Sequence, residues 1–580
     1  MQDERSAAAD SRRFDAPFAR VKLADPLFRY GDFRAAERFY RLAIERGTAT
    51  AAVRIGLGNA LYAGGRRTEA VVEYEAALRL DPEAPPAHAN LAALLLELGR
   101  PVEAAAHCRA ALARQPGNAS LHHRLGLALL RTDTADEAEA SLREAVRLAP
   151  GSAAARNDLG LVLAQRFDHT AAASSFRKAL QLRPDFVAAR ANLGGVLAKQ
   201  GKRTAAAGAC RAALQRNPRH APAHHNLATV LRDAGHLAEA EQSARAALRL
   251  DPNYAEAHVG LAMTLLLAGR FEEGWAEYEW RWRLPKPARH IARFRQPRWD
   301  GTPLGDRVLL LHAEQGFGDT LQFCRYAPLV AAQGRVVLEI QGALHWLMAG
   351  LPKVERVVKV GEPLPHFDLH CPLLSLPYVL GTTMTTIPAE TPYLTAPPGS
   401  VAAWRRKLEP IPGVKVGLVW AGSPTMSADR GRSLTLDRLA PLAGVPGITF
   451  VSLQKGEAAG EAPPEGMVLH DWTEDLVDFA ETAALIESLD LVIGVDTAVV
   501  HLAGALAKPV WLLNRFDQCW RWLEEREDSP WYPSLRQLRQ TAPGDWNGVL
   551  ARVRQGLERI AADRDARPNL LRSLMRFTTA

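Results

Sequence analysis

Residues 85–118 read PPAHANLAALLLELGRPVEAAAHCRAALARQPGN, and this 34-residue unit decides the fold of the first half of the chain. Apolar residues at helical spacing, such as Leu91, Leu94, Leu95 and Leu98, predict a first helix. A proline then ends a second helix, because it cannot continue one. The proline recurs at the same 34-residue spacing, which chance does not produce, at Pro82, Pro116, Pro150, Pro184, Pro218 and Pro252.

Two further columns share this register. A glycine recurs where the first helix of each pair ends in a left-handed conformation, and a small residue recurs where the second helix approaches its neighbour. The pattern resembles the tetratricopeptide repeat (TPR), with Asp133 and Phe167 in place of the glycine, and predicts about seven repeats plus a degenerate first one over residues 17–285. The columns are Gly31, Gly65, Gly99, Gly201, Gly235 and Gly269, and Ala36, Ala70, Ala104, Ala138, Ala172, Ala206, Ala240 and Gly274.

Stacked repeats of this kind expose an extended concave face that binds a peptide or protein, and a dimerisation or spacer arm is the alternative. One column of the first helices reads Asn90, Arg124, Asp158, Asn192, Asn226 and Gly260. Its asparagines resemble the ladder of the O-linked N-acetylglucosamine transferases, whose amides hold the acceptor backbone. The resemblance implies acceptor binding by Asn90, Asn192 and Asn226. Because the column is broken, a docked folded acceptor is equally possible. A separate alternative is that each asparagine only bonds the neighbouring repeat.

The composition is that of a soluble globular protein, with 47% hydrophobic and 23% charged residues, and 580 residues exceed a single hydrophobic core. A net charge of +7, spread along the chain, argues against a nucleic-acid partner and favours anionic ligands such as diphosphates. Five scattered cysteines without a C-x-x-C pair predict neither a disulfide framework nor a thiolate metal site. No bilayer-spanning stretch and no apolar signal region are found, so we expect a cytoplasmic protein.

The repeat pattern ends in a dense aromatic run. Trp275, Tyr278, Trp280 and Trp282 fall within eight residues. Such density predicts burial, with the run capping the array and attaching it to the next domain. A carbohydrate-stacking site is the alternative. A basic, proline-dotted linker over residues 286–306 follows.

From Arg307 short strands alternate with helices, which predicts parallel sheets. Two series of strands predict two Rossmann-like lobes with a ligand cleft between them. The lobes are residues 307–400 and 401–562, followed by a tail, residues 563–580. The predicted strands are 308–312, 335–340, 354–360 and 367–371 in the first lobe, and 414–420, 448–453, 490–495 and 509–513 in the second.

Four segments of this half carry a family resemblance: residues 314–323 (EQGFGDTLQF), 421–424 (AGSP), 496–502 (DTAVVHL) and 528–533 (DSPWYP). They resemble the TPR-linked bacterial glycosyltransferases. The catalytic half of that group is similar to the lipopolysaccharide heptosyltransferases, and its plan to the O-linked N-acetylglucosamine transferases. The resemblance implies a GT-B catalytic half that uses a nucleotide-sugar donor. Some members of the group glycosylate flagellin, which makes flagellin one candidate acceptor.

The candidate catalytic residue is Asp319. The resemblance implies that its carboxylate takes the proton of the attacking hydroxyl, which an inverting transfer requires. A helix cap is the alternative role, because aspartate is a favoured cap. Gly316 and Gly318 lie where the first strand turns into a helix, so their backbone amides are expected to face the donor.

Asp496, Thr497 and His501 follow a buried strand and begin a helix, the usual position of a phosphate site. The resemblance implies that they line the diphosphate and ribose, although Ala498 replaces the usual glycine. Donor contacts are also expected from the turn at Ser423. No D-x-D or E-x-D tripeptide stands where such folds hold a metal, so we expect no metal cofactor. The candidate cations that would neutralise the diphosphate instead are Arg430, Arg432 and Lys455.

These observations predict an inverting, metal-independent glycosyltransferase that moves a sugar from a nucleotide donor to a Ser or Thr hydroxyl of a protein held by the TPR arm. A TPR scaffold with a non-catalytic nucleotide-sugar-binding domain is one alternative. A transferase acting on a glycan is another, although a small saccharide needs no surface as long as the arm. The donor remains open among uridine diphosphate N-acetylglucosamine, another hexose and a cytidine-linked nonulosonic acid.

Overall fold

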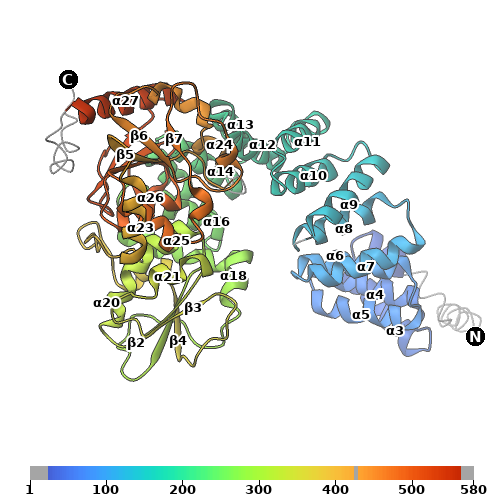
Figure 1. Ribbon diagram of the computed structural model, residues 1–580. Coiled ribbons are helices and arrows are strands. Elements are labelled where there is room, and N and C mark those ends of the chain that lie inside the picture. Colours follow the sequence, from blue (N-terminus) through green and yellow to red (C-terminus); the bar gives the residue numbers. More distant parts are fainter. Residues whose placement is uncertain (1–23, 133, 424–428, 563–580) are drawn as a thin grey trace, which may run out of the picture. The chain divides into compact units, whose positions relative to one another are not determined.

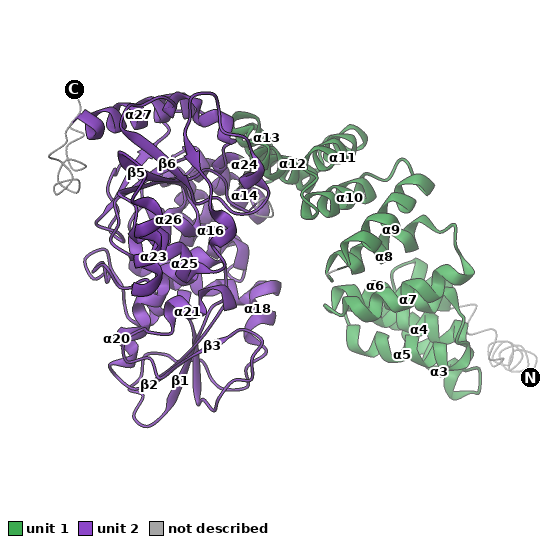
Figure 2. Ribbon diagram, in the orientation of Figure 1, with its two compact units in different colours: residues 1–218 green, residues 219–580 purple. Residues whose placement is uncertain are grey.

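The computed structural model describes residues 24–132, 134–423 and 429–562, and the chain divides into two compact units, residues 1–218 and 219–580 (Figure 2). The first unit is built from TPR helix pairs, coloured blue to teal in Figure 1. Its helices are α3 (Phe33–Glu45), α4 (Ala51–Ala63), α5 (Arg67–Leu80), α6 (Pro85–Glu97), α7 (Pro101–Arg114), α8 (Ala119–Leu130), α9 (Ala135–Leu148), α10 (Ala153–Gln165), α11 (His169–Leu182), α12 (Val187–Lys199) and α13 (Arg203–Arg216).

The repeat columns have the roles that the sequence predicts. All seven alanines of the small-residue column, from Ala36 to Ala240, have no exposed surface, because a helix packs against each. The six glycines of the other column are left-handed, with φ between 73° and 86°. Phe167 replaces a glycine and keeps this conformation at φ 63°, with its side chain exposed. Both expectations are confirmed, and Asp133 lies outside the described residues.

The second unit begins with the last repeats and the aromatic junction. Trp275, Tyr278 and Trp282 are buried, which confirms the structural role expected for this run. The Trp275 ring packs edge-on against Phe323, at 6.3 Å between centroids, and against Trp520, at 5.2 Å. The last repeat therefore shares its core with the sheets of this unit. The elements are α14 (Ala221–Asp233), α15 (Leu237–Leu250), α16 (Ala255–Leu267), α17 (Phe271–Tyr278), η1 (Glu279–Arg283) and α18 (Pro285–Ile291).

The first lobe contains a four-stranded parallel sheet in the order β3-β2-β1-β4. Its central strand β1 is buried at every position, and all of its residues except His312 are apolar. The elements are β1 (Val308–His312), α19 (Phe317–Phe323), η2 (Cys324–Tyr326), α20 (Ala327–Ala331), β2 (Arg335–Ile340), η3 (Gly342–Leu344), α21 (His345–Met348), β3 (Arg356–Lys359), β4 (Leu369–Pro372), η4 (Leu373–Ser375) and α22 (Leu376–Val379).

The second lobe contains a six-stranded parallel sheet in the order β10-β9-β8-β5-β6-β7. Read from β7, this is the strand order of dinucleotide-binding Rossmann folds, and the order reverses between β5 and β8. The elements are α23 (Pro398–Leu408), β5 (Val414–Val419), α24 (Asp429–Arg432), η5 (Leu436–Leu442), β6 (Ile448–Ser452), η6 (Glu457–Gly460), β7 (Leu469–His470), η7 (Thr473–Asp475), α25 (Phe479–Glu487), β8 (Leu491–Val495), α26 (Ala498–Ala505), β9 (Val510–Asn514), η8 (Trp520–Trp522), β10 (Leu535–Arg539) and α27 (Trp546–Ala562).

All eight strands predicted from the sequence are present, and the predicted architecture of a TPR solenoid followed by two parallel α/β lobes is confirmed. The sequence analysis missed β7 and β10. The first has only two residues, and the second carries Arg536, Gln537 and Arg539, so neither reads as an apolar run. Within the described ranges, no helix has the length and hydrophobicity that crossing a bilayer requires.

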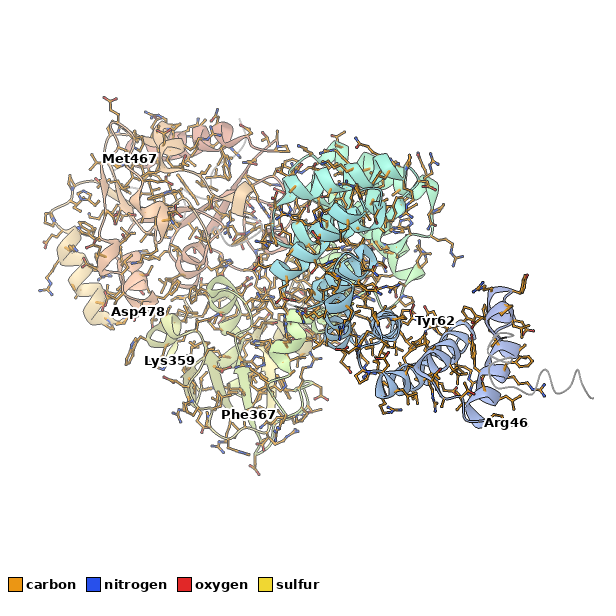
Figure 3. The ribbon with its side chains drawn as sticks, turned by 90° about the vertical axis from the view of Figure 1, so that its right-hand side faces the viewer. Arg46, Tyr62, Lys359, Phe367, Met467 and Asp478 are labelled. Atoms are coloured by element: carbon orange, nitrogen blue, oxygen red, sulfur yellow. The ribbon has the colours of Figure 1, made fainter. Side chains whose placement is uncertain are left out.

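Three histidines form a row of ring contacts at the first lobe, in which His312 and His370 are buried and His290 of α18 is half-buried. Nε2 of His290 lies 3.2 Å from Nδ1 of His312, and Nε2 of His312 lies 3.1 Å from Nδ1 of His370. Phe294 covers them and contacts Phe367, which Figure 3 labels. Burial, together with the charges of nearby arginines, lowers the pKa of His370 to about 4, and burial places the pKa of His312 well below its ordinary value.

The buried histidines of this row make the stability of the protein depend on pH. The unfolded chain protonates these histidines as the pH falls below their ordinary pKa of 6.5, whereas folded His370 stays neutral until about pH 4. The free energy of unfolding should therefore decrease as the pH falls from 6.5 towards 4, by about 2 kcal/mol at pH 5 for one such histidine. We expect His370→Gln, which removes this titration, to lose less thermal stability than the wild type between pH 7 and pH 5. His366→Gln, at an exposed histidine, is the control, and an unchanged pH dependence in His370→Gln would contradict the prediction.

Candidate functional site

The first candidate residue, Asp319, lies at the beginning of α19. It is the third residue of the helix, and its Oδ2 accepts the N–H of Gly316 at 3.1 Å, so the carboxylate does serve as a cap. Its Oδ1 accepts a hydrogen bond from Arg521 of the second lobe. The side chain is 19% exposed, so this capping role leaves it accessible to a reacting group.

Gly318 is required for packing. A Cβ at this position would lie 2.9 Å from Cδ2 of His501 and 3.6 Å from Cα of Ala498. Helix α19, which follows β1, therefore packs directly on α26, which follows β8. This contact joins the carboxyl ends of the central strands of both sheets. The missing side chain of Gly318 leaves room for the His501 ring, and the contact expected between its backbone and the donor stays a prediction.

The second group of candidates lies between β8 and α26. His501 is buried, with Nε2 3.6 Å from Oδ1 of Asp496 and Nδ1 2.9 Å from the hydroxyl of Tyr532. Burial alone would raise the pKa of Asp496, but the hydrogen bond and charge of His501, with Trp522 and Arg432, lower it to about 2. The Asp496 carboxylate is therefore held ionised.

Thr497 is the N-cap of α26, and its side chain makes no capping hydrogen bond. Its hydroxyl oxygen is buried and has no hydrogen-bond partner among the described residues. A buried hydroxyl normally finds a partner, and a helix N-terminus favours an anion. A phosphate oxygen at the N-terminus of α26 fits both requirements.

The loop after β5 comes next to the Asp496 loop because β5 and β8 are neighbours. Nη1 of Arg432 donates to the carbonyl of Asp496 at 2.8 Å. Its guanidinium lies against Gly422, where a Cβ would come within 2.0 Å of Nη2. Arg432 therefore connects the two loops at the point where the strand order reverses, the usual ligand position in such sheets.

The remaining donor candidates are less closely placed. Ser423 lies exposed in the loop after β5. Lys455 follows β6, one strand further away, and its Nζ donates to the carbonyl of Thr473 at 2.6 Å. The side chain of Arg430 lies outside the described residues. The structure thus brings Arg432, Asp496, Thr497 and His501 together.

Three positioning residues were missed by the sequence analysis. Gln454 accepts the N–H groups of Trp420 and Ala421, at 3.0 and 2.8 Å, and fixes the β5 loop. Tyr532 orients His501, and Arg521 binds Asp319. Buried aromatic side chains surround Arg521, namely Trp520, Trp522, Trp531 and Tyr532, and their density in the sequence gives no sign of these polar contacts.

The asparagines of the repeat array bond neighbouring helices. Nδ2 of Asn90 donates to Oδ1 of Asn59 at 2.8 Å, and Nδ2 of Asn192 donates to Oδ1 of Asn157 at 3.0 Å. Asn226 is half-buried on α14. The amides of Asn90 and Asn192 therefore bond the neighbouring repeat, and acceptor binding by these asparagines stays a prediction.

Models of known protein families match segments in both halves of the chain. The model of glycosyltransferase family 9 (heptosyltransferase) matches residues 476–513, which begin directly after η7, end in β9 and include Asp496, Thr497 and His501. Tetratricopeptide repeat models match residues 58–99, 123–185, 163–231 and 231–274. The chain therefore carries TPR repeats, and the segment at the candidate donor site is similar to glycosyltransferase family 9.

Protein FlbA of Caulobacter vibrioides is 31% identical to this chain over 323 residues, which cover 50% of this chain and 53% of FlbA. The chain thus spans about half the length of this relative. Among solved structures, a tetratricopeptide repeat protein from Parabacteroides merdae is 17% identical, covering 43% of this chain and 98% of its own, with a TM-score of 0.38. PilF of Pseudomonas aeruginosa is 25% identical, covering 36% of this chain and 94% of its own, with a TM-score of 0.31.

The contact between α19 and α26 yields a prediction. Gly318→Ala places a methyl group against the His501 ring, which Trp522 and Tyr532 hold in place, so we expect a loss of about 1–3 kcal/mol in the free energy of unfolding. Gly316→Ala is the matched control, because its methyl would meet nothing nearer than Oδ2 of Asp319, at 3.5 Å. Thermal unfolding should separate the two variants, and equal midpoints would contradict this close approach.

Proposed function

We propose that this chain is a glycosyltransferase that uses a nucleotide-sugar donor. The observation that carries the proposal is the position of Asp496, Thr497 and His501: they lie inside the family 9 match and at the reversal of strand order in a Rossmann-like sheet. Nucleotides bind such sheets at this point. Helix α19, which follows β1 and carries Asp319, packs on the same helix α26.

The donor side supplies fixed charges for the leaving diphosphate. The N-terminus of α26 and the unpartnered hydroxyl of Thr497 would bind phosphate oxygens. The Arg432 guanidinium, which already reaches Asp496, would place a cation beside them. Charge developing on the diphosphate would thus be stabilised by groups that are in place beforehand, so the proposal needs no metal.

The acceptor side would use Asp319 as the base. A single base that deprotonates the attacking hydroxyl, on the face opposite the leaving nucleotide, gives inversion at the sugar carbon. The carboxylate is held by Gly316 and Arg521 and remains partly exposed. It therefore has a defined orientation towards an incoming hydroxyl.

We further propose a Ser or Thr hydroxyl of a protein as the acceptor, with the TPR arm as its docking surface. Extended repeat arrays bind peptides and proteins, and flagellin is one candidate because some TPR-linked transferases modify it. A glycan acceptor would leave the first unit without a role in catalysis. A scaffold would bind the nucleotide sugar without turning it over.

The assignment of the base is tested with Asp319→Asn. The wild type is incubated in EDTA with uridine diphosphate N-acetylglucosamine, uridine diphosphate glucose or a cytidine-linked nonulosonic acid, and nucleotide release is measured together with mass increments on co-purified protein. Asn keeps the shape but cannot accept the proton, so turnover should fall about 10²–10⁴-fold while nucleotide affinity changes only a few-fold. Asp300→Asn, at an exposed turn, should behave like the wild type. Near-normal turnover in Asp319→Asn would rule out this base.

The role of the arm is tested by removing residues 1–218, because residues 219–580 form a compact unit of their own. Remote binding energy positions an acceptor and does not assist bond breaking by itself. The shortened chain should keep nucleotide binding and slow donor hydrolysis but lose most transfer to protein. Full-rate protein transfer by the shortened chain would show that the arm is no acceptor clamp.

A further inference from the structure

We infer that residues 519–525 form a rigid mount that positions the carboxylate of Asp319 through Arg521. This mount segment runs through η8, between β9 and β10. The inference rests on the proposed function, because the residue that the mount segment positions is the proposed base, Asp319. Arg521 is a positioning residue in this account, since it acts through Asp319.

The contacts of Arg521 are directional. Its Nη2 donates to Oδ1 of Asp319, its Nε donates to Oε1 of Gln322 at 2.7 Å, and its Nη1 contacts Sγ of Cys519 at 3.2 Å. The guanidinium also stacks over Trp520, 4.4 Å from the ring centroid. Because the N–H of Gly316 donates to Oδ2, both carboxylate oxygens of Asp319 accept a hydrogen bond. The carboxylate therefore keeps one orientation.

The pair joins the two lobes. Asp319 belongs to α19 of the first lobe, and Arg521 belongs to the second. Burial alone would lower the pKa of Arg521, but the Asp319 charge raises it above its ordinary value, so each group neutralises the other. The other charged side chain beside Asp319 on this lobe is Glu314, which is paired with Arg281 at 2.9 Å. From α26, His501 packs against the same turn.

The mount segment is itself held in a strained conformation. Leu523 has φ 56° and is buried. Nε2 of Gln537 donates to the carbonyl of Trp522 at 2.6 Å, and Nε2 of Gln518 donates to that of Leu523. Asn514 donates to both glutamines, at 2.8 and 2.9 Å. Strained backbone persists only where its surroundings over-determine it, and such positions cluster at functional sites.

The mount segment also touches both the donor site and the last repeat. Trp522 stacks on His501 at 5.2 Å between ring centroids. Trp520 packs edge-on against Trp275, and the N–H of Glu524 donates to the carbonyl of Leu267 at 3.4 Å. One short segment therefore supports the base, the donor histidine and the end of the repeat array. Movement of Arg521 would therefore change the orientation of the Asp319 carboxylate without removing a proposed contact to the nucleotide sugar.

The test compares Arg521→Gln and Arg521→Lys in the full chain, with the donor that the wild type turns over and water or protein as acceptor. Loss of orientation should lower kcat about 100-fold in Arg521→Gln, with the donor KM changed less than about threefold. Lysine keeps the positive charge but not the several N–H donors of the guanidinium group, so Arg521→Lys should fold and have a kcat about tenfold lower than the wild type. Arg526→Gln is the matched control, because Arg526 pairs with Asp528 at 2.6 Å just beyond the segment and should keep the wild-type kcat.

A second comparison separates positioning from a general structural effect. In an Asp319→Asn background, Arg521→Gln should cause no further loss of kcat, since the group that it positions no longer acts as a base. Three results would each overturn the inference. Arg521→Gln could lower kcat equally in the wild-type and Asp319→Asn backgrounds, or it could change KM alone. It could also raise kcat, which would show that Arg521 masks Asp319. If the wild type turns over a donor and both Arg521 variants match it, the inference fails and the proposed function stands. A wild type that turns over none of the donors overturns the proposed function and the inference with it.

Discussion

The close approach of α19 to α26 is the contact on which the candidate site depends. It is possible because Gly318 has no side chain where the ring of His501 lies. Each helix begins at the carboxyl end of a central strand, so this one contact brings Asp319 and the Asp496 loop into the same region of the second unit. The ring cannot retreat from the glycine, because Trp522 and Tyr532 hold it from other sides.

Buried polar contacts complete this arrangement. Arg432 ties the loop after β5 to the loop after β8, and Gln454 holds the β5 loop from the neighbouring strand β6. The ionised Asp496 and the buried His501 are paired in turn. Because an unpaired polar group in a core is costly, these side chains leave the loops few alternative conformations. The loops are therefore preorganised before any donor arrives.

The repeat array and the lobes share one core at their junction. Trp275 of α17 packs against Phe323 of the first lobe and Trp520 of the second. This explains why the compact unit begins at residue 219, inside the repeat region, and includes α14 to α17. The last repeats are therefore part of the α/β unit as well as the end of the solenoid.

The sequence by itself determined the helix pairs, eight of the ten strands in the described part of the chain, and the polar loop after β8. Each follows from local spacing: a 34-residue period, apolar runs, and polar residues directly after a strand. Local spacing could not predict that Arg521 meets Asp319, 202 residues away, or that Asn90 and Asn192 bond neighbouring helices. It also missed β10, which has too few apolar residues to stand out. Only the tertiary structure decided these, because they depend on which distant elements pack together and on the partners that buried polar groups then find.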